Sequence, residues 1–437
     1  MTRSLHVWMN GELVGAWQVD RDSHTFRYEA TWLESPHSRS LSLSMPISSS
    51  LEIKGEAVKN YFDNLLPDSH HIRKRLAKRF KAGTDIFSLL EAIGRDCVGA
   101  VQLLPDGATP DGWNRIAYEA LSDEEIEQYL QAVPSDMRFV PDDDLFRISI
   151  AGAQEKTAFL QYQHQWCRPH GATPTTHIFK LPLGIIGGTR LDMSDSVEND
   201  WLCAQIIAAM GLPVATTSMA KFGEQKALVV ERFDRAWMDD GRWIARLPQE
   251  DFCQALGISP DQKYEADGGP GMQQCLRLLQ RSSQASDTLF FILTQLLFFL
   301  LRATDGHAKN YSLFTGRNDI YQMTPLYDVL SVWPYLDKPK QLDSHKAGLA
   351  MALRSKNPHY RFKEIQTRHW HDLAMKNGGP ATWAAMQLFA SRVDLALAHV
   401  ETLLPADFPV MTWDAISKGT RLEAERFLAN AAGIEKS

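Results

Sequence analysis

The sequence predicts an α+β protein in which a small mixed N-terminal region precedes a sheet and then a mainly helical lobe. Three observations support this. Short alternating apolar runs dominate the first hundred residues or so, similar runs return after residue 144, and helical spacing of apolar residues dominates after residue 251. With 437 residues, 44% of them hydrophobic, the chain is long enough to form more than one core.

The N-terminal region begins with a predicted β-hairpin. Two alternating apolar runs within residues 4–18 flank Asn10-Gly11, a strong signal for a tight hairpin turn. A helical region is predicted over residues 60–80. Further strand-like runs lie at residues 24–30, 40–46 and 98–104.

Residues 105–143 are rich in Pro, Asp and Gly and are interpreted as a linker region that holds one helix near residues 123–132. We therefore place an N-terminal subdomain at residues 1–105, a linker at residues 106–143 and a second domain at residues 144–437.

The second domain begins with short strand-like runs and continues as helices. Residues 196–210 have apolar residues at helical spacing and are followed by Gly211, so a helix is predicted there. After residue 251 the chain is predicted to be mainly helical, apart from residues 310–314 and 320–325. The strand-like runs lie at residues 145–150, 156–162, 176–182 and 226–233.

Composition excludes several classes of protein. The net charge of -7 means that any DNA contact needs a local basic patch. The five cysteines form no CxxC pair, which argues against a disulfide framework or a zinc site and favours buried, reduced thiols. The apolar run at residues 289–301 is too short to span a bilayer and is predicted to be a buried core helix. The N-terminus lacks an apolar signal core, so no export is expected.

A polar stretch, TDGHAKNYSLF, follows that apolar run. It holds Asp305, His307 and Asn310 as D-x-H-x-x-N, and Asp328 follows a later predicted strand. In phosphoryl transfer one carboxylate orients the attacking hydroxyl, while an asparagine and a second carboxylate hold Mg²⁺. The Asp-to-Asn spacing is that of the protein-kinase catalytic loop, although the histidine follows the aspartate, as in lipid kinases. Taken alone, these residues are better explained as an ordinary turn between a helix and a strand.

Lys180 lies inside an apolar strand-like run, where burial of a lysine is unfavourable unless it is paired. The strand lysine of kinases lies in such a place and contacts ATP phosphates. Glu198 or Asp200, on the following predicted helix, could pair with it, and the two remain open. The alternative is an edge-strand lysine that faces water.

Two further segments fit the same interpretation. The stretch SIAGAQEK, residues 149–156, could wrap its backbone N–H groups around phosphates, although alone it is better explained as a hairpin turn. Residues 231–234 end a predicted strand and would suit a hinge whose backbone binds adenine; an ordinary strand end is the alternative. Phosphate loop, lysine, acidic helix, hinge, D-x-H-x-x-N and metal aspartate follow one another in the order found in kinases.

These residues, together with motifs along the whole chain, resemble the HipA family of bacterial Ser/Thr kinases, the toxins of HipBA toxin–antitoxin modules. The motifs that carry the resemblance are WMNGELVG, LSLSMP, NYFDNLLPDS, EAIGRDCVGAV, FRISIAGAQEKTA, TPTTHIFKLP, VERFDR, RLPQEDFCQALG, KYEADGGPG, ATDGHAKN and TPLYDVLS. The resemblance implies a bilobal fold like that of protein and lipid kinases, with a nucleotide-binding sheet part at residues 144–235 and a mainly helical lobe at residues 236–437.

The resemblance also implies residue roles. Asp305 is expected to be the catalytic base, and Asn310 and Asp328 the Mg²⁺ ligands. Residues expected to contact ATP or its metal are Ala151, Gly152, Ala153, Gln154, Glu155, Lys156, Lys180, Glu231, Arg232, Phe233, His307, Lys309, Asn310, Tyr327 and Asp328. The role of His307 stays open between a contact with phosphate or the transition state and holding the loop in shape. The metal aspartate lies in YDV and not in D-F-G, so the control of protein kinases through their activation loop is not expected to apply to this chain.

Ser149 matches the autophosphorylated serine of the family. A phosphate adds about -1.5 to -2 charges, and beside the phosphate loop it could hold that loop outside the site. We therefore expect phosphorylation of Ser149 to switch the enzyme off; an ordinary buried strand serine is the alternative.

The resemblance further implies partners and a location. Glutamyl-tRNA synthetase is the expected substrate, with inhibition of translation and persistence as the outcome. A HipB-like dimeric helix-turn-helix antitoxin is the expected partner, bound with this chain to operator DNA to repress their operon. A bacterial cytoplasmic location is expected, associated with the nucleoid when the antitoxin is bound, and without a membrane.

The basic run at residues 72–83 could touch the DNA backbone, or it could be a solvated helix face. Two other functions stay open. One is a small-molecule phosphotransferase on the same scaffold. The other is a catalytically inactive co-repressor, against which the joint presence of Lys180, Asp305, Asn310 and Asp328 argues.

Overall fold

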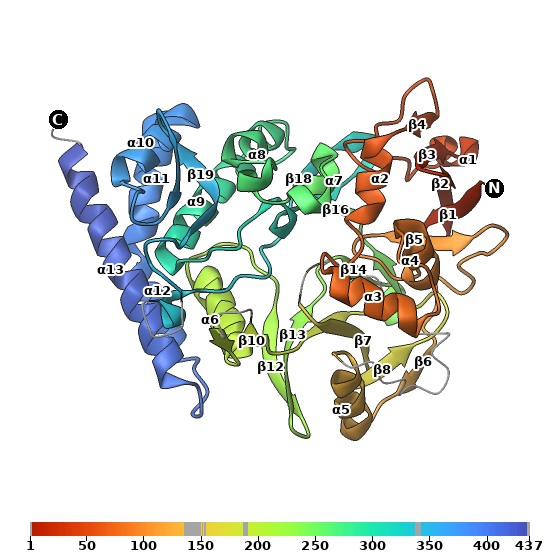
Figure 1. Cartoon of the computed structure of the whole chain (residues 1–437), viewed down its shortest axis with the longest axis horizontal. Helices are drawn as coiled ribbons and strands as arrows, with labels where there is room; N and C mark the ends of the chain where they lie inside the picture. Colours follow the sequence, from red (N-terminus) through yellow and green to blue (C-terminus); the bar gives the residue numbers. More distant parts are fainter. Residues whose placement is uncertain are drawn as a thin grey trace. The chain divides into compact units, whose positions relative to one another are not determined.

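The computed structural model describes residues 2–134, 150, 152, 154–186, 191–336 and 342–434. The chain divides into two compact units, and Figure 1 labels many of their elements. Unit 1 comprises Met1–Leu181, Ala220–Gln262 and Ser312–Tyr321, and unit 2 comprises Pro182–Met219, Lys263–Tyr311 and Gln322–Ser437. The predicted N-terminal subdomain and the sheet of the second domain therefore belong to one compact unit.

The N-terminal part of unit 1 is a five-stranded antiparallel sheet covered by helices. Its strand order is β4-β3-β2-β1-β5. The predicted hairpin is confirmed, because Met9 pairs with Glu12 and both turn residues, Asn10 and Gly11, have positive φ. The elements are β1 (Arg3–Met9), β2 (Glu12–Asp20), β3 (Ser23–Tyr28), α1 (Ala30–Glu34), β4 (Glu52–Lys54), α2 (Glu56–Asp63), α3 (His70–Arg79), α4 (Ile86–Ile93) and β5 (Val101–Pro105).

Two local predictions in this part need correction. Residues 40–46 form no strand, only an isolated bridge between Ser42 and Met45. The serine hydroxyls there bond to nearby backbone and to Glu250, which competes with ladder hydrogen bonding. The helical region at residues 60–80 is two helices, since α2 ends at Asp63 and Ser69 caps the start of α3.

The second part of unit 1 is a six-stranded sheet of order β12-β13-β9-β7-β8-β6. Its strands are β6 (Tyr118–Ala120), β7 (Lys156–Tyr162), β8 (Gln165–Pro169), β9 (His177–Lys180), β12 (Thr217–Phe222) and β13 (Gln225–Glu231). The strands predicted at residues 156–162, 176–182 and 226–233 are thereby confirmed. The strand predicted at residues 145–150 lies outside the described residues, except for Ile150.

The predicted linker contributes to this sheet. β6 pairs with β8, and helix α5 (Asp123–Ala132) forms over the predicted residues, started by a capping box between Ser122 and Glu125. Ile126 and Leu130 of α5 are fully buried against the sheet core. Composition concealed this, because Pro, Asp and Gly mark the turns between these short elements.

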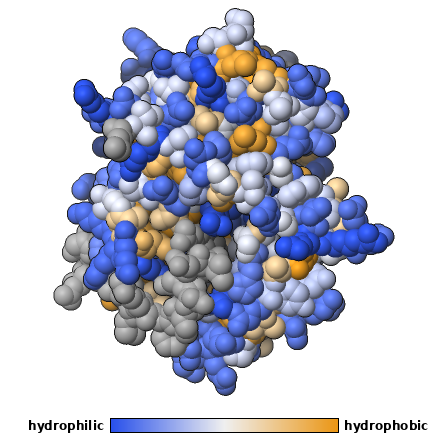
Figure 2. All heavy atoms as spheres, turned by 90° about the vertical axis from the view of Figure 1, so that its right-hand side faces the viewer, coloured by the Kyte–Doolittle hydropathy of each residue, from blue (hydrophilic) through white to orange (hydrophobic). Residues whose placement is uncertain are grey.

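Smaller elements complete unit 1. They are β14 (Arg235–Met238), β15 (Trp243–Arg246), β16 (Gln249–Asp251), α7 (Phe252–Leu256) and β17 (Ser312–Thr315), followed by β18 (Tyr321–Met323) at the unit boundary. Figure 2 shows one face of the molecule, where mainly hydrophilic residues surround separate hydrophobic patches.

Unit 2 is mainly helical, as predicted. Its helices are α6 (Ser196–Ala209), α8 (Met272–Leu279), α9 (Asp287–Leu301), α10 (Thr367–Lys376), α11 (Gly379–Ser391), α12 (Val393–Glu401) and α13 (Val410–Ile434). α9 carries the long apolar run and is buried along most of its length. Across the described ranges, no helix combines the length and the apolar character needed to cross a membrane. The five cysteines are buried and free of disulfides, as predicted.

The prediction of helices after residue 251 missed a hairpin of β19 (Gly348–Arg354) and β20 (Pro358–Arg361). The residues LAMALR of β19 are good helix formers, so local preference favoured the wrong state. All five residues from Leu349 to Leu353 are buried, which shows that packing decided the strand. A short pair, β10 (Gly184–Ile186) and β11 (Leu191–Met193), also belongs to unit 2.

Candidate active site

The apolar helix α9 ends at Arg302, which adopts the left-handed conformation with φ of 55°. The Ala303 N–H then donates to the Phe298 carbonyl at 2.8 Å, which completes the helix end. Ala303 also pairs with Ser331 in an antiparallel bridge. The polar loop therefore begins on a helix anchored in the core of unit 2.

The pairing of Ala303 with Ser331 brings together the chain segments that carry Asp305 and Asp328. Ser331 is itself held from α6: the Asn199 side chain donates to the Ser331 carbonyl at 2.8 Å and accepts from its N–H at 2.9 Å. Asn199 and Ser331 are fully buried. Neither was singled out from the sequence, because they lie 132 positions apart and nothing local indicates the contact.

Gly306 is the point at which the loop passes closest to α9. A Cβ at this position would lie 2.6 Å from Cδ2 and 2.7 Å from Cε2 of Phe298. Because a ring packed in the core has little room to move, any larger residue would displace the loop or the helix. Glycine is thus required at position 306 because the loop backbone lies so close to the Phe298 ring.

Asp305 is the exposed member of the loop, with a side chain that is 54% exposed. Its carboxylate accepts a hydrogen bond from the Tyr264 hydroxyl and lies 3.8 Å from His307 Nε2. The ring of His307, 3% exposed, meets the ring of Tyr264 edge-on at 4.8 Å. Tyr264 and His307 therefore hold one side of the Asp305 carboxylate, while the rest of the group stays accessible.

Asn310 closes the loop onto its own beginning. Its amide nitrogen donates to the Asp305 carbonyl at 2.7 Å, and its N–H donates to the His307 carbonyl at 2.9 Å. The side-chain amide then has its Oδ1 as an acceptor. The Tyr327 hydroxyl donates to the Lys309 carbonyl at 2.9 Å, and Asp328 has a positive φ of 60°. Together, Asn310 and Asp328 offer the hard oxygen donors that suit Mg²⁺.

Unit 1 holds the residues predicted to bind phosphates. Lys156 on β7 and Lys180 on β9 lie directly opposite each other in the antiparallel ladder. Lys180 is only 6% exposed. Like charges directly opposite repel, so an anion such as a phosphate would stabilise this pair. Lys180 therefore does not lie at a solvated edge.

The described part of the phosphate loop is tied to the N-terminal part of unit 1. Gly152 has φ of 111°, bridges to Pro67, and accepts from the Asp68 N–H at 3.0 Å. A Cβ on Gly152 would lie 2.5 Å from Lys156 Nζ. The Gln154 side chain donates to the Leu181 carbonyl. The predicted loop residues Ala151 and Ala153, and the predicted modification site Ser149, lie outside the described residues.

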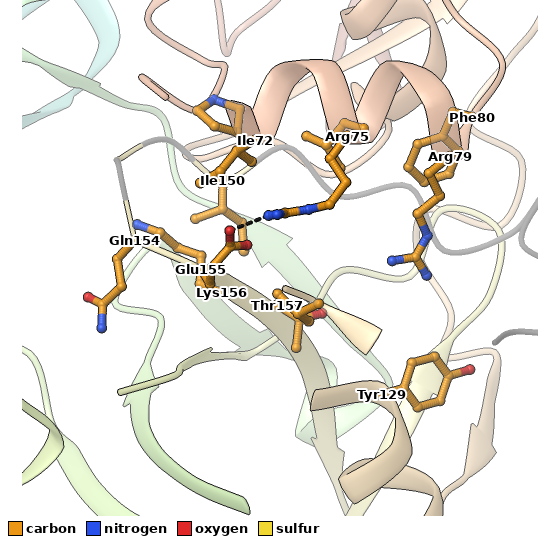
Figure 3. A pocket seen from close by; sticks show the side chains of 13 residues that line it. Ile72, Arg75, Arg79, Phe80, Tyr129, Ile150, Gln154, Glu155, Lys156 and Thr157 are labelled. Carbon is orange, nitrogen blue, oxygen red and sulfur yellow. Dashed lines mark hydrogen bonds and ion pairs between the residues drawn. The ribbon is translucent and has the colours of Figure 1, made fainter. Parts of the chain in front are cut away.

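Figure 3 shows a small pocket, of about 90 Å³, beside this loop. It is lined from α3, α5 and β7, and Arg75 of α3 forms an ion pair with Glu155 across it. Arg73 likewise pairs with Asp63 at 2.6 Å, and both arginine side chains are 11% exposed. These two arginines of the basic run therefore serve internal contacts and are poorly placed for a DNA backbone.

The predicted hinge segment, Glu231 to Phe233, lies at the end of β13. Its side chains alternate: Glu231 is exposed and Phe233 half-buried, whereas Arg232 is 5% exposed. The Arg232 guanidinium bonds to Asp96, Thr175 and other inward groups. The side chain of Arg232 is thus committed to the interior of unit 1, and the contact of the hinge backbone with adenine stays a prediction.

The predicted residues therefore fall into two sets. Gly152, Gln154, Glu155, Lys156, Lys180 and the hinge segment lie in unit 1, and Asp305, His307, Lys309, Asn310, Tyr327 and Asp328 lie in unit 2. The acidic candidates for Lys180, Glu198 and Asp200, are both buried on α6 of unit 2, and the choice between them stays a prediction. Tyr264 was missed, although it lies in the quoted motif KYEADGGPG.

An antiparallel sheet with an inward lysine, followed by an Asp/Asn loop on a core helix, defines a kinase-like protein. Residues 5–104 match the family described as HipA N-terminal domain, and residues 148–400 match the HipA-like C-terminal domain. The chain therefore belongs to the HipA family, as its motifs predicted.

Relatives and solved structures agree. The chain is 33% identical over 342 residues to Y4mE of Sinorhizobium fredii, whose name assigns it to the kinases; the match covers 77% of this chain and 79% of that protein. It is 27% identical over 361 residues to the serine/threonine-protein kinase toxin HipA of Shewanella oneidensis, covering 78% of each.

The solved complex of Shewanella oneidensis HipA with HipB and operator DNA matches with a TM-score of 0.80 over 99% of both chains, at 23% identity. This likeness confirms the predicted α+β kinase-like fold. Family and relatives together support a protein kinase.

Proposed function

We propose that this chain is an ATP-dependent Ser/Thr protein kinase that acts as the toxin of a HipBA-type module. The observation that carries the proposal is the loop of unit 2, where Asp305 is held by Tyr264 and His307 on one side and left exposed on the other. A general base needs this combination, because it must be positioned and still reach a substrate hydroxyl.

Each set of residues has a separate task. Asp305 accepts the proton of the attacking hydroxyl, and His307 keeps the loop in shape through its contact with Asp305. Asn310 Oδ1 and the Asp328 carboxylate would hold Mg²⁺, which neutralises charge on the transferred phosphoryl group. Lys156 and Lys180 would bind phosphate oxygens, since two positive charges directly opposite each other in the ladder favour an anion.

The remaining hinge groups bind adenine through the backbone around Glu231 and Phe233. The loop predicted at residues 151–156 would cover the phosphates. The Arg232 side chain has no part in this contact, because it is used within unit 1.

The relatives support the proposed partners, whereas the proposed substrate rests on the family resemblance of the sequence. The Shewanella oneidensis relative is named a toxin and was solved with HipB and operator DNA. We infer that this chain likewise binds a HipB-like antitoxin dimer, contacts operator DNA through that complex, and co-represses its operon from the bacterial cytoplasm and nucleoid. Glutamyl-tRNA synthetase is the proposed substrate, with persistence as the outcome, and autophosphorylation of Ser149 is the proposed off-switch.

One experiment tests these points together. The purified chain is incubated with Mg-ATP, alone and with glutamyl-tRNA synthetase, and intact masses are measured. Phosphate on both proteins is expected; Ser149→Ala should remove it from the chain only. Asp305→Asn should remove it from both proteins.

Other outcomes would change the proposal. Phosphate on the chain but not on the synthetase would leave a kinase with another substrate. Phosphate on neither protein, with wild type and Asp305→Asn alike, would exclude kinase activity. Consumption of ATP only when sugars or aminoglycosides are added would favour the small-molecule phosphotransferase.

A further inference from the structure

A buried ionic network joins the N-terminal part of unit 1 to its six-stranded sheet. At its centre, Asp96 is 5% exposed. One carboxylate oxygen accepts from Thr175 Oγ1 at 2.7 Å, from the Thr175 N–H at 3.1 Å and from Arg232 at 3.4 Å. The other accepts from Arg235 at 3.0 Å and from two nitrogens of Arg246 at 3.1 and 3.2 Å.

Asp234 extends the network on the sheet side. It accepts two bonds from Arg232, at 2.8 and 3.0 Å, and one from the Gly99 N–H at 2.7 Å. Arg232 and Arg235 both donate to the carbonyl of Cys97. The segment around Asp96 is therefore bound to the sheet through side chains and backbone alike.

The network is well satisfied electrostatically. Burial alone would raise the pKa of Asp96, but Arg235, Arg246 and Arg232 outweigh burial and hold that pKa well below its usual range. The Arg232 guanidinium donates through all three of its nitrogens. Nε and Nη2 donate to Asp234, Nη2 also donates to the Cys97 carbonyl, and Nη1 donates to Asp96 and Thr175. A saturated arginine of this kind has one allowed position.

That position fixes the hinge segment. The burial pattern of the segment agrees with this, because Arg232 and Asp234 are buried, whereas Glu231 is exposed and Phe233 is half-buried. The Arg232 N–H donates to the Thr176 carbonyl at 2.8 Å, so the backbone is fixed as well as the side chain. Asp96, which lies 136 residues earlier in the chain, thus sets the orientation of the hinge backbone.

We propose that Asp96 is a positioning residue for the adenine-binding backbone of the hinge segment, acting through Thr175, Arg232 and Arg235. The N-terminal part of unit 1 is then a component of the nucleotide site and not only a docking module. This inference rests on the proposed nucleotide site. It goes further by assigning nucleotide affinity to a residue in the region that matches the HipA N-terminal domain.

The test compares two ligands that report on different parts of that site. Adenosine depends on the hinge, and magnesium tripolyphosphate depends on the lysines and the phosphate loop. In Asp96→Asn, the calorimetric Kd for adenosine should rise about tenfold or more, because a small displacement of the hinge backbone weakens its contacts with adenine. The Kd for tripolyphosphate should stay within about twofold of wild type, and KM for Mg-ATP should rise more than kcat falls.

Two further variants keep the result interpretable. Thr175→Val removes the hydroxyl that bridges Asp96 and Arg232 while keeping the side-chain shape. The Kd for adenosine should therefore rise again, by less than in Asp96→Asn, while the Kd for tripolyphosphate stays unchanged. This variant provides the test if Asp96→Asn fails to fold. Asp106→Asn removes a carboxylate from the same part of unit 1 at a side chain that is 79% exposed, and should change neither Kd.

The outcomes separate this inference from the proposed kinase function. Unchanged adenosine binding in folded Asp96→Asn and Thr175→Val, or equal loss of both ligands, would overturn the positioning role while the kinase function stands. A wild-type chain that binds neither adenosine nor Mg-ATP would overturn the proposed function and the inference together.

Discussion

Asp96 in unit 1 and Asp305 in unit 2 are two aspartates held in opposite ways. Asp96 is buried and accepts bonds from three arginines and a threonine, so both oxygens are occupied. Asp305 is half-exposed and is held on one side by a tyrosine and a histidine. A buried carboxylate with both oxygens occupied holds structure, whereas a carboxylate whose side chain is 54% exposed can be reached by a substrate hydroxyl.

Asp305→Asn should give the largest change and should affect activity alone. Loss of a general base lowers phosphoryl transfer by about 100- to 10,000-fold, while a half-exposed side chain contributes little to stability. Activity is measured as phosphate incorporated per minute, and stability by urea unfolding. A stability loss comparable to that of Asp96→Asn would mean that Asp305 is structural and would break the contrast.

Asp96→Asn should show the opposite pattern in stability. The substitution removes a buried charge that three arginines share, Arg232, Arg235 and Arg246, and should lower the free energy of unfolding by about 3 kcal/mol. Asp106→Asn is the control, and its change should stay within about 0.5 kcal/mol. A neutral Asp96→Asn would show that the arginines find other partners.

Gly306→Ala tests whether the exposed loop depends on the helix beneath it. The new Cβ would overlap the Phe298 ring, so we expect a loss of about 2 kcal/mol in stability and a fall in activity as Asp305 moves. Phe298→Leu in the same chain should recover part of both losses. Gly433→Ala, which has open space around its Cβ, should be neutral.

Glu250→Gln tests how a buried carboxylate without arginine partners differs from Asp96 in its effect on stability. Glu250 is 1% exposed and accepts from Ser42 and from the Leu43 N–H, with no arginine among these partners. Burial raises its pKa to about 8, the reverse of Asp96. The folded chain then binds more protons than the unfolded chain between the ordinary glutamate pKa and pH 8, so stability should fall as pH rises through this window.

The change for wild type should be about 1 kcal/mol between pH 6 and pH 7. In Glu250→Gln the dependence should flatten in that range, measured by urea unfolding at a series of pH values. A wild-type curve already flat between pH 5 and pH 8 would show that the two donors keep Glu250 ionised.

Tyr264→Phe should give the smallest change. It removes one hydrogen bond to an exposed carboxylate that His307 still faces, so kcat should fall only about three- to tenfold with KM for Mg-ATP unchanged. A fall as large as that of Asp305→Asn would assign Tyr264 a direct part in the reaction.

Elements with strong local signals were predictable from the sequence. The Asn10-Gly11 hairpin, α5 with its capping box, and α6 followed by Gly211 are each specified by residues only a few positions apart. The ordered motifs also predicted the family, and with it the fold class, because their combination along the chain is far more specific than any single one.

The site was only partly predictable, because only some of its residues are close together in the sequence. Asp305, His307 and Asn310 lie within six residues, so their spacing already indicated a common loop. Tyr264 contacts Asp305 from a segment far away in the chain, and Asn199 holds Ser331, which pairs with Ala303 just before the loop. Nothing in their local sequence distinguishes them from ordinary polar residues.

By itself, the sequence determined the local turns, the capped helices, the buried nature of α9 and the family. Only the tertiary structure decided that LAMALR is a strand, that Arg232 faces inward, and that Asp96 bonds to residues more than 75 positions away. Long-range packing and buried charge outweigh local preference, because both depend on partners that come together only when the chain has folded.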